Sequence, residues 1–211
     1  DIIGDVDWTD STKSSTCEMI ANLLLNSSLV MDTRISENLF VGMVFDSDRF
    51  LLPNTSAETL KTAYELVSTS NINFVNLYDN LYERSISEEK FRAYLINNIE
   101  ITDNKFGFIF VPSEDLKKFN VEATSVSNQV NDFYFIKELI CWMFVVYDER
   151  NNIYKANIRS RGPVINEVAS KYNGGGHKFA SGCRTSDYKV IEALAKDLDS
   201  VCKEYFNEEN I

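Results

Sequence analysis

Apolar residues recur at helical spacing through the first hundred residues of the chain. Ser15-Thr16-Cys17-Glu18 has the Ser-x-x-Glu form of a capping box, and the apolar positions after it predict a helix over about 16–26. Residues 35–45 favour a buried helix, with a strand left open over so short a run. Further helices are expected from a second capping box, Thr55-x-x-Glu58, to about Ser68, and at about 74–82 and 88–98.

The pattern changes to strands after about residue 100. Continuous apolar runs at 106–111 and 140–147 predict strands covered on both faces. Residues 153–159 alternate in polarity and predict a β-hairpin with the run before them. Helices are expected near 113–119 and 124–134, from Pro163 to about Tyr172, and over about 188–206.

Length and composition bound the architecture. A chain of 211 residues that is 44% apolar can bury one large or two small cores, and the change of pattern favours two. We expect an α/β protein with a mostly helical segment 1–70, a helical linker 71–99 and an α/β domain with a mixed sheet over 100–211. The chain starts at Asp1 without an initiator methionine, so we expect a processed or excised piece with further residues upstream.

Targeting signals are not visible in the sequence. The chain has no run of about 18 apolar residues and no basic, apolar leader. These observations predict a cytoplasmic protein without a membrane partner.

The densest cluster of unusual residues is the nine-residue stretch 174–182, GGGHKFASG. It holds four of the chain's eight glycines and its only histidine, His177. Three consecutive glycines imply positive φ angles or a close backbone approach. One interpretation is a nest of backbone N–H donors for an anion such as phosphate, assisted by the imidazole. The other is a helix C-cap followed by a loop with a surface histidine.

Charge is unevenly distributed around this cluster. The formal net charge is −11, which would ordinarily speak against a phosphate-bearing partner. Between residues 155 and 184, however, six basic residues face a single acid, Glu167. This basic island is typical of a focused anion site, although a solvated basic face would look the same. Arg159 and Arg161 leave a predicted strand where the glycine cluster leaves a predicted helix, and short connections favour their meeting.

A second candidate segment follows the apolar run that ends at Phe45. Asp46, Asp48 and Arg49 come directly after it, and buried elements often deliver functional residues at their ends. A helix end with solvated acids is the alternative.

Three motifs resemble one protein family. The run 158–182, with its Arg159-Ser160-Arg161 and its GGGH followed by Ala-Ser-Gly, resembles the DHH-associated C-terminal domain of the DHH phosphoesterases, most of all that of bacterial nanoRNases that also act on phosphoadenosine phosphate. Residues 14–18, SSTCE, resemble the family's Ser-Ser-Thr-x-Glu helix start. Residues 41–50, followed by Pro-Asn-Thr, resemble the segment with its last metal-binding aspartate.

The resemblance implies a two-metal hydrolase. Family members hold two manganese ions with Asp-x-Asp, a further aspartate and Asp-His-His, all in the first domain. This chain has one histidine and therefore lacks Asp-His-His, which we expect upstream of Asp1. Asp46 matches one metal ligand, and Asp48 stands where relatives usually have glycine. We therefore expect this chain alone to bind manganese weakly and to be inactive.

The resemblance also implies roles for the second half of the chain. Arg159, Ser160 and Arg161 would bind substrate phosphate, residues 174–176 would surround it with N–H groups, and His177 would contact substrate and take part in catalysis. The implied activity is hydrolysis of short oligoribonucleotides or of 3′-phosphoadenosine 5′-phosphate. Two alternatives stay open: a cyclic-dinucleotide phosphodiesterase, and a non-catalytic RNA-binding module like the related domain of alanyl-tRNA synthetases. The oligomeric state is also open, with a homodimer among the options.

Overall fold

The computed structural model describes residue 5 and residues 7–209. The chain divides into two compact units, Asp1–Glu83 and Arg84–Ile211. Within the described residues no helix is long and apolar enough to cross a membrane.

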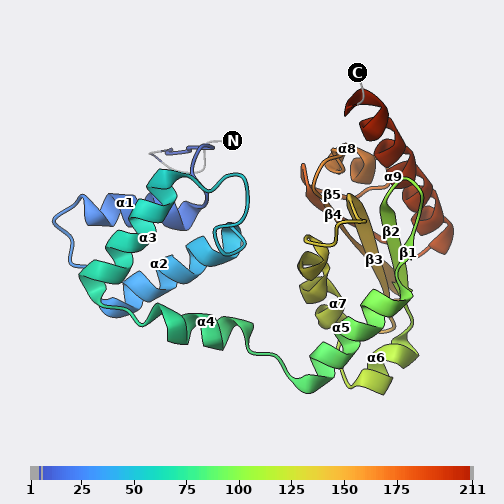
Figure 1. Ribbon diagram of the computed structural model, residues 1–211, viewed down its shortest axis with the longest axis horizontal. Helices are drawn as coiled ribbons and strands as arrows, with labels where there is room; N and C mark the ends of the chain where they lie inside the picture. Colours follow the sequence, from blue (N-terminus) through green and yellow to red (C-terminus); the bar gives the residue numbers. More distant parts are fainter. Residues whose placement is uncertain (1–4, 6, 210–211) are drawn as a thin grey trace. The chain divides into compact units, whose positions relative to one another are not determined.

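The first unit is helical (Figure 1). Its helices are α1 (Thr16–Leu25), α2 (Thr33–Asp46), α3 (Ala57–Ser70) and α4 (Phe74–Tyr82). They enclose a core in which Phe40, Met43 and Leu66 are buried. At Gly42 an added Cβ would lie 2.2 Å from Cys17 Sγ, so this glycine allows α1 and α2 to pack closely. The four predicted helices are therefore confirmed, and 35–45 is helix, not strand.

The N-caps of these helices use the expected chemistry with one change. Ser15 Oγ accepts from the backbone N–H of Glu18 at α1, as the sequence predicts. At α3 the cap is Ser56, whose hydroxyl accepts from Thr59 N–H while Thr59 Oγ1 accepts from Ser56 N–H. The expected box Thr55-x-x-Glu58 is thus wrong by one residue, because Thr59 can satisfy the cap as well as a glutamate would.

The carboxylate of Glu18 needs hydrogen-bond donors from the protein, because this charged side chain is fully buried in the first unit. Its Oε2 accepts from Ser14 N–H at 2.8 Å, from Ser14 Oγ at 2.6 Å and from Thr59 Oγ1 at 2.9 Å. Lys13 Nζ lies 3.8 Å from Oε1. This carboxylate ties the start of α1 to α3 and gives the SSTCE sequence a structural role.

The second unit contains a six-stranded mixed sheet in the order β1-β2-β3-β4-β6-β5. Its strands are β1 (Glu100–Ile101), β2 (Phe106–Val111), β3 (Cys141–Asp148), β4 (Ile153–Ser160), β5 (Gly175–His177) and β6 (Ala180–Thr185). Its helices are α5 (Ile86–Asn98), α6 (Ser113–Phe119), α7 (Ala123–Gln129), the 3-10 helix η1 (Val130–Phe133), α8 (Asn166–Ser170) and α9 (Tyr188–Glu209). Strands β2 and β3 are parallel and all other neighbours are antiparallel, which confirms an α/β fold with a mixed sheet.

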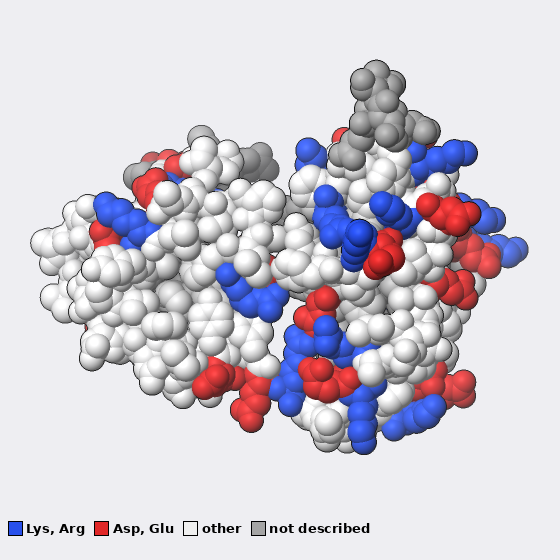
Figure 2. All heavy atoms as spheres, in the orientation of Figure 1, with Lys and Arg blue, Asp and Glu red and all other residues white. Residues whose placement is uncertain are grey.

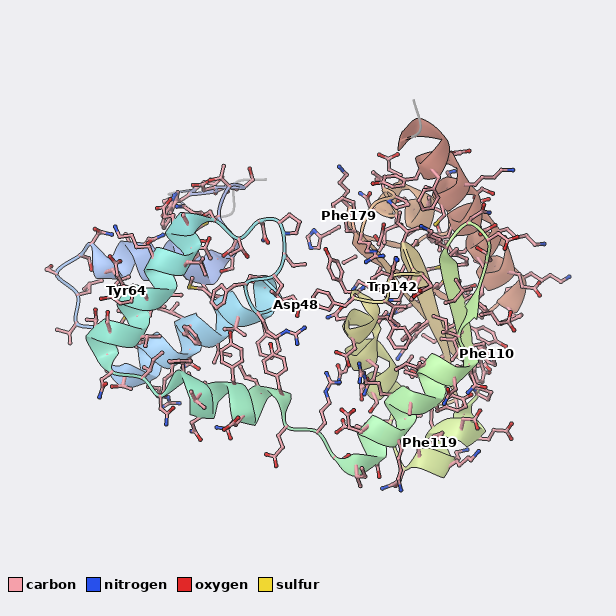
Figure 3. The ribbon with its side chains drawn as sticks, in the orientation of Figure 1. Asp48, Tyr64, Phe110, Phe119, Trp142 and Phe179 are labelled. Atoms are coloured by element: carbon pink, nitrogen blue, oxygen red, sulfur yellow. The ribbon has the colours of Figure 1, made fainter. Side chains whose placement is uncertain are left out.

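The two faces of this sheet carry separate cores. Met143, Val145 and Ile158 pack with α8 and α9 on one face. Trp142 and Phe144 pack with α5, α6, α7 and η1 on the other (Figures 1 and 3). The buried residues of this second core come from β2 and β3 but not from β4, β5 or β6. The β4–β6–β5 part of the sheet therefore stays open on the α7 side.

The structure corrects several expected elements. The helix expected over 163–172 is reduced to α8, and Pro163 lies before it, where its carbonyl accepts a bond from Ser160. The glycine cluster is not a loop ending that helix but forms β5 and the start of β6, because backbone pairing across the hairpin overrides the poor strand propensity of glycine. The helix expected over 124–134 is divided into α7 and η1.

The segment expected as a linker divides between the units. Helix α4 lies in the first unit, whereas α5 lies in the second, where Phe91 and Leu95 are fully buried. Arg84 begins the second unit and forms two hydrogen bonds to the Asp132 carboxylate, Nη1 to Oδ2 and Nη2 to Oδ1.

Candidate functional site

Strand register brings two of the predicted site residues onto one row of the open sheet face. Arg159 on β4 pairs with Ala180 on β6, which pairs in turn with His177 on β5. Directly paired residues share a face of the sheet, and the same row begins at Trp142, on the α7 side. Arg159 and His177 thus face the same side, and their backbones lie about 10 Å apart across the sheet, because two strand spacings separate them. The sequence predicts that the strand end with Arg159 lies close to the glycine cluster, and this proximity is confirmed.

The Arg159 guanidinium is held in place from two directions. Its Nε donates to Asn131 Oδ1 at 2.8 Å and its Nη1 donates to the Ile158 carbonyl at 2.9 Å. Burial lowers the pKa of Arg159 from its ordinary value, because it disfavours the charged form. The remaining N–H groups on Nη1 and Nη2 have no protein partner within the described part of the chain.

Arg161 and Ser160 complete the end of β4. Arg161 Nη2 donates to the Lys137 carbonyl at 2.9 Å and Nη1 to the Tyr134 carbonyl at 3.3 Å. Ser160 is buried, its hydroxyl donates to the Pro163 carbonyl at 2.7 Å, and it accepts from Gly162 N–H at 3.1 Å. The Ser160 hydroxyl therefore stabilises the turn that carries the two arginines.

Neither arginine has a carboxylate partner among the residues that the structure describes. Among the described residues no ion pair includes Arg159 or Arg161, although Lys155 on the same strand pairs with Asp148 at 2.6 Å. Arg159 is partly buried and Arg161 is exposed, and neutral oxygen acceptors hold both guanidinium groups without neutralising their charge. An anionic ligand would therefore be stabilised here. The end of β4 is therefore suited to phosphate.

The three glycines have different reasons to be glycine. Gly176 has φ +138°, and a Cβ there would lie 2.5 Å from the Ala180 carbonyl oxygen. A Cβ on Gly174 would lie 2.4 Å from the Gly182 carbonyl oxygen. At Gly175, by contrast, a Cβ would meet no protein atom within 4 Å. Packing explains the first two glycines, and the third faces open space.

The expected nest of backbone donors is only partly available. The N–H of Gly174 donates to the Ala169 carbonyl at 2.9 Å, so it cannot also bind a ligand. Gly175 and Gly176 pair with Gly182 and Ser181 in the hairpin. Strand formation thus removes the Gly174 donor and leaves the arginine and histidine side chains as the better-supported ligand groups.

Asp46 is the last residue of α2 in the first unit, and Asp48 lies in the turn that follows it (Figure 3 labels Asp48). Asp46 is exposed, and Asp48 contacts Arg49 at 3.0 Å. Asp48, Arg49 and Phe50 have φ values of 43°, 64° and 65°, a left-handed turn that costs roughly 1–2 kcal/mol per residue. A glycine would adopt this φ without strain, which explains physically why Asp48 is unexpected there.

The described residues do not fit a two-metal centre. No group of three or more His, Cys, Asp or Glu side chains in the described part of the chain could hold a metal ion. Asp46 alone provides one carboxylate, whereas each ion of such a centre needs several ligands.

Three residues on or beside the open face were not singled out as site residues from the sequence, although Arg184 was counted in the basic island. Asn131 was missed because its contact with Arg159 spans 28 positions. Asn157 and Arg184 project on the same side as Arg159, as the alternation of β4 and the pairing of β6 require. Alternation within 155–159 was a usable signal for Asn157, while Arg184 depends on a strand that was not predicted.

The fold and the site define a protein with a helical unit and an α/β unit whose open sheet face presents uncompensated arginines and a histidine. The DHHA1 domain family matches residues 104–204, which lie within the α/β unit. Two curated bacterial relatives align with nearly the whole chain. Residues 104–204 therefore form a DHHA1 domain, as the motifs indicate, in a chain that is similar to these relatives over nearly its whole length.

The first of these relatives is the bifunctional oligoribonuclease and PAP phosphatase NrnA of Bacillus subtilis. It is 34% identical over 208 residues, which cover 97% of this chain and 66% of the relative. The probable NrnA of Streptococcus mutans is 30% identical over 203 residues, with 96% and 65% covered. The chain thus spans about two thirds of the length of these relatives.

A solved structure supports the fold independently. The crystal structure of an exopolyphosphatase-related protein from Bacteroides fragilis superposes with a TM-score of 0.84 at 24% identity. The match covers 94% of this chain and 61% of that one. At this identity the likeness shows the shared fold.

Proposed function

We propose that this chain supplies the substrate-binding part of a manganese-dependent phosphoesterase that hydrolyses short oligoribonucleotides, 3′-phosphoadenosine 5′-phosphate, or both. The observation that carries the proposal is the row formed by Arg159, Ala180 and His177 on the open sheet face. The names of the relatives agree with it, since they describe an oligoribonuclease and PAP phosphatase.

In this proposal each side chain has a separate task. Arg159 and Arg161 bind non-bridging phosphate oxygens through their free N–H groups, and their charges are not neutralised by the protein. His177 donates to the same or the next phosphate from the far side of the row. Because Asn131 and main-chain carbonyls already hold the guanidinium groups, little side-chain entropy is lost when the ligand binds.

The metal-binding part is proposed to lie mainly outside this chain. Manganese would activate the attacking water when bound, and Asp46 is the one described residue that matches a family ligand. Since the described residues do not form a metal centre, the chain alone should bind nucleotides but not hydrolyse them.

Calorimetric titration of the 211-residue chain with AMP tests the binding role. We expect Arg159→Ala to weaken binding at least about tenfold and His177→Ala about fivefold, at one fixed salt concentration. Lys203→Ala, an exposed charge on α9 at the opposite face, should leave the affinity unchanged. Equal affinities in all four proteins would refute the site.

A second candidate is a nucleotide-binding module without catalysis. The same lack of a metal-binding group among the described residues favours it. Hydrolysis assays on the full-length protein with manganese separate the two functions, because a module would bind a dinucleotide without cleaving it. Comparing linear dinucleotide with cyclic-di-AMP in that assay tests the cyclic-dinucleotide alternative.

A further inference from the structure

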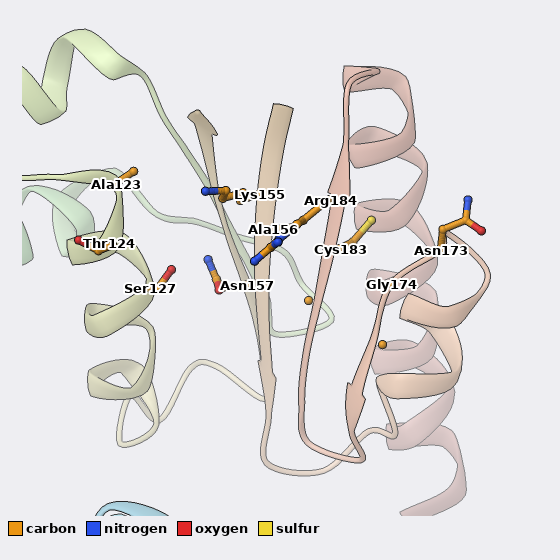
Figure 4. Close-up of a pocket in the computed structure, with 12 residues that line it drawn as sticks. Ala123, Thr124, Ser127, Lys155, Ala156, Asn157, Asn173, Gly174, Cys183 and Arg184 are labelled. Atoms are coloured by element: carbon orange, nitrogen blue, oxygen red, sulfur yellow. The ribbon is translucent and has the colours of Figure 1, made fainter. Parts of the chain in front are cut away.

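A hollow of about 500 Å³ lies on the open face beside the Arg159 row (Figure 4). Strands β4, β6 and β5 form its floor and α7 forms one wall. Figure 2 shows basic and acidic side chains interspersed on the second unit, while the first unit is mainly uncharged in that view.

The register defines what faces into the hollow. Asn157 pairs with Gly182, and Gly182 pairs with Gly175, which places two glycines beside one amide in the next row of the face. Lys155 and Arg184 form the row after that. The middle of the floor is therefore bare backbone, flat enough for a planar ring to lie against it. Gly175 is glycine here without any protein atom near its absent Cβ.

The polar groups around this floor are unoccupied. Within the described residues, the side chains of Asn157, Thr124, Ser127 and Arg184 form no hydrogen bond or ion pair, although all four line the hollow. Lys155 is neutralised by Asp148 at 2.6 Å, so the uncompensated charge in the hollow belongs to Arg184. In Figure 4 the Arg184 side chain points from β6 toward β4.

We propose that this hollow binds a second nucleotide of a short oligoribonucleotide, next to the one whose phosphate Arg159 and His177 hold. This inference rests on the proposed function and extends it to a second subsite. The base lies on the glycine floor, the Asn157 amide donates to and accepts from its edge, and Arg184 binds the following phosphate. Arg159 and Lys155 are four positions apart on β4, roughly 13 Å, so the face extends well beyond a single phosphate contact.

The preference for single-stranded RNA follows from the same groups. The Asn157 amide can read the pairing edge of an unpaired base, and this edge is occupied by the partner base in a duplex. The two hydroxyls can contact ribose hydroxyls, which distinguish RNA from DNA. Arg184 adds one phosphate contact, so longer ligands should bind with a steeper salt dependence than AMP.

The test compares ligands of different length on the same 211-residue chain. Arg184→Ala and Asn157→Ala should each weaken binding of the trinucleotide ApApA by about tenfold and leave AMP within about twofold. Both side chains are at least partly exposed, so the variants should fold, which circular dichroism can verify. Lys203→Ala is the control on the opposite face and should change neither affinity.

The outcomes separate this inference from the function on which it rests. Suppose that Arg159→Ala weakens the binding of both AMP and ApApA. The second subsite is then refuted, and the phosphate site stands, if Arg184→Ala and Asn157→Ala leave both affinities unchanged or lower the AMP affinity as much as the ApApA affinity. If Arg159→Ala and His177→Ala change nothing, the phosphate site is refuted. A chain that binds neither ligand contradicts both.

Discussion

The Nε atom of Arg159 donates a hydrogen bond of 2.8 Å to Oδ1 of Asn131. Asn131 lies on η1, and its neighbour Asp132 binds Arg84 at the beginning of the unit. The arginine proposed to bind phosphate is therefore positioned by a short helix that is itself anchored. This contact explains how an arginine without a carboxylate partner keeps one orientation.

Removing the Asn131 side chain should therefore weaken ligand binding without direct contact to the ligand. We expect Asn131→Ala to lower the affinity for AMP about threefold to tenfold, since Arg159 loses one hydrogen bond that orients it. Asn128→Ala is the matched control, because Asn128 is exposed on α7 and forms no side-chain hydrogen bond among the described residues. Calorimetric titration measures both, and equal losses in the two variants would contradict a positioning role.

The glycines of β5 should respond differently to the same substitution. Gly176→Ala places a Cβ 2.5 Å from a carbonyl oxygen at φ +138°, and should lower the free energy of unfolding by about 2 kcal/mol. Gly175→Ala should change stability by less than about 0.5 kcal/mol and yet reduce ApApA binding, because its methyl group enters the hollow. Urea denaturation measures the free energy of unfolding of both variants, and calorimetric titration measures their affinity for ApApA. A Gly175→Ala protein with unchanged ApApA affinity would show that the floor is not used.

How far the sequence predicted this site depends on the range of each interaction. Helix α4 and strand β2 were predicted at their observed bounds, because local periodicity determines them. Strand β5 was not, since three residues containing two glycines have no strand signal until β6 pairs with them. The role of Arg159 was suggested by motif and charge, whereas its row with His177 depends on register and its support by Asn131 depends on a distant helix.

Glu18 should be the most sensitive charged residue of the first unit. Glu18→Ala leaves the Ser14 and Thr59 donors buried without their acceptor, so we expect a loss of about 3 kcal/mol in unfolding free energy. Glu58→Ala removes an exposed partner of Lys13 and should cost less than about 1 kcal/mol. Scanning calorimetry of the first unit's unfolding transition measures the loss of unfolding free energy in each of the two variants. Similar losses in both variants would mean that the buried network contributes little.

Ionisation of Tyr94 should make the unfolding free energy of the second unit depend on pH. Burial and the hydrogen bond to Asp115 raise the pKa of Tyr94 from 10 to about 12. The folded state therefore favours the protonated phenol, and the resulting stability is complete below pH 10 and is lost as the pH rises toward 12.

Unfolding followed by Trp142 fluorescence, in a Trp8→Phe background, isolates this unit. The free energy of unfolding should fall more steeply between pH 10 and pH 12 in this protein than in the same protein carrying Tyr94→Phe. Parallel curves for the two proteins would exclude Tyr94 as the source.

The proposed phosphate site is tested most directly by mapping where a nucleotide binds on the second unit. Backbone amide chemical shifts of the ¹⁵N-labelled chain can be followed during titration with 3′-phosphoadenosine 5′-phosphate. We expect the largest changes at Arg159, Ala180 and His177, with smaller changes along β4 and β6 toward the hollow. Changes confined to α9 or to the first unit, or no change at saturating ligand, would contradict the proposed site.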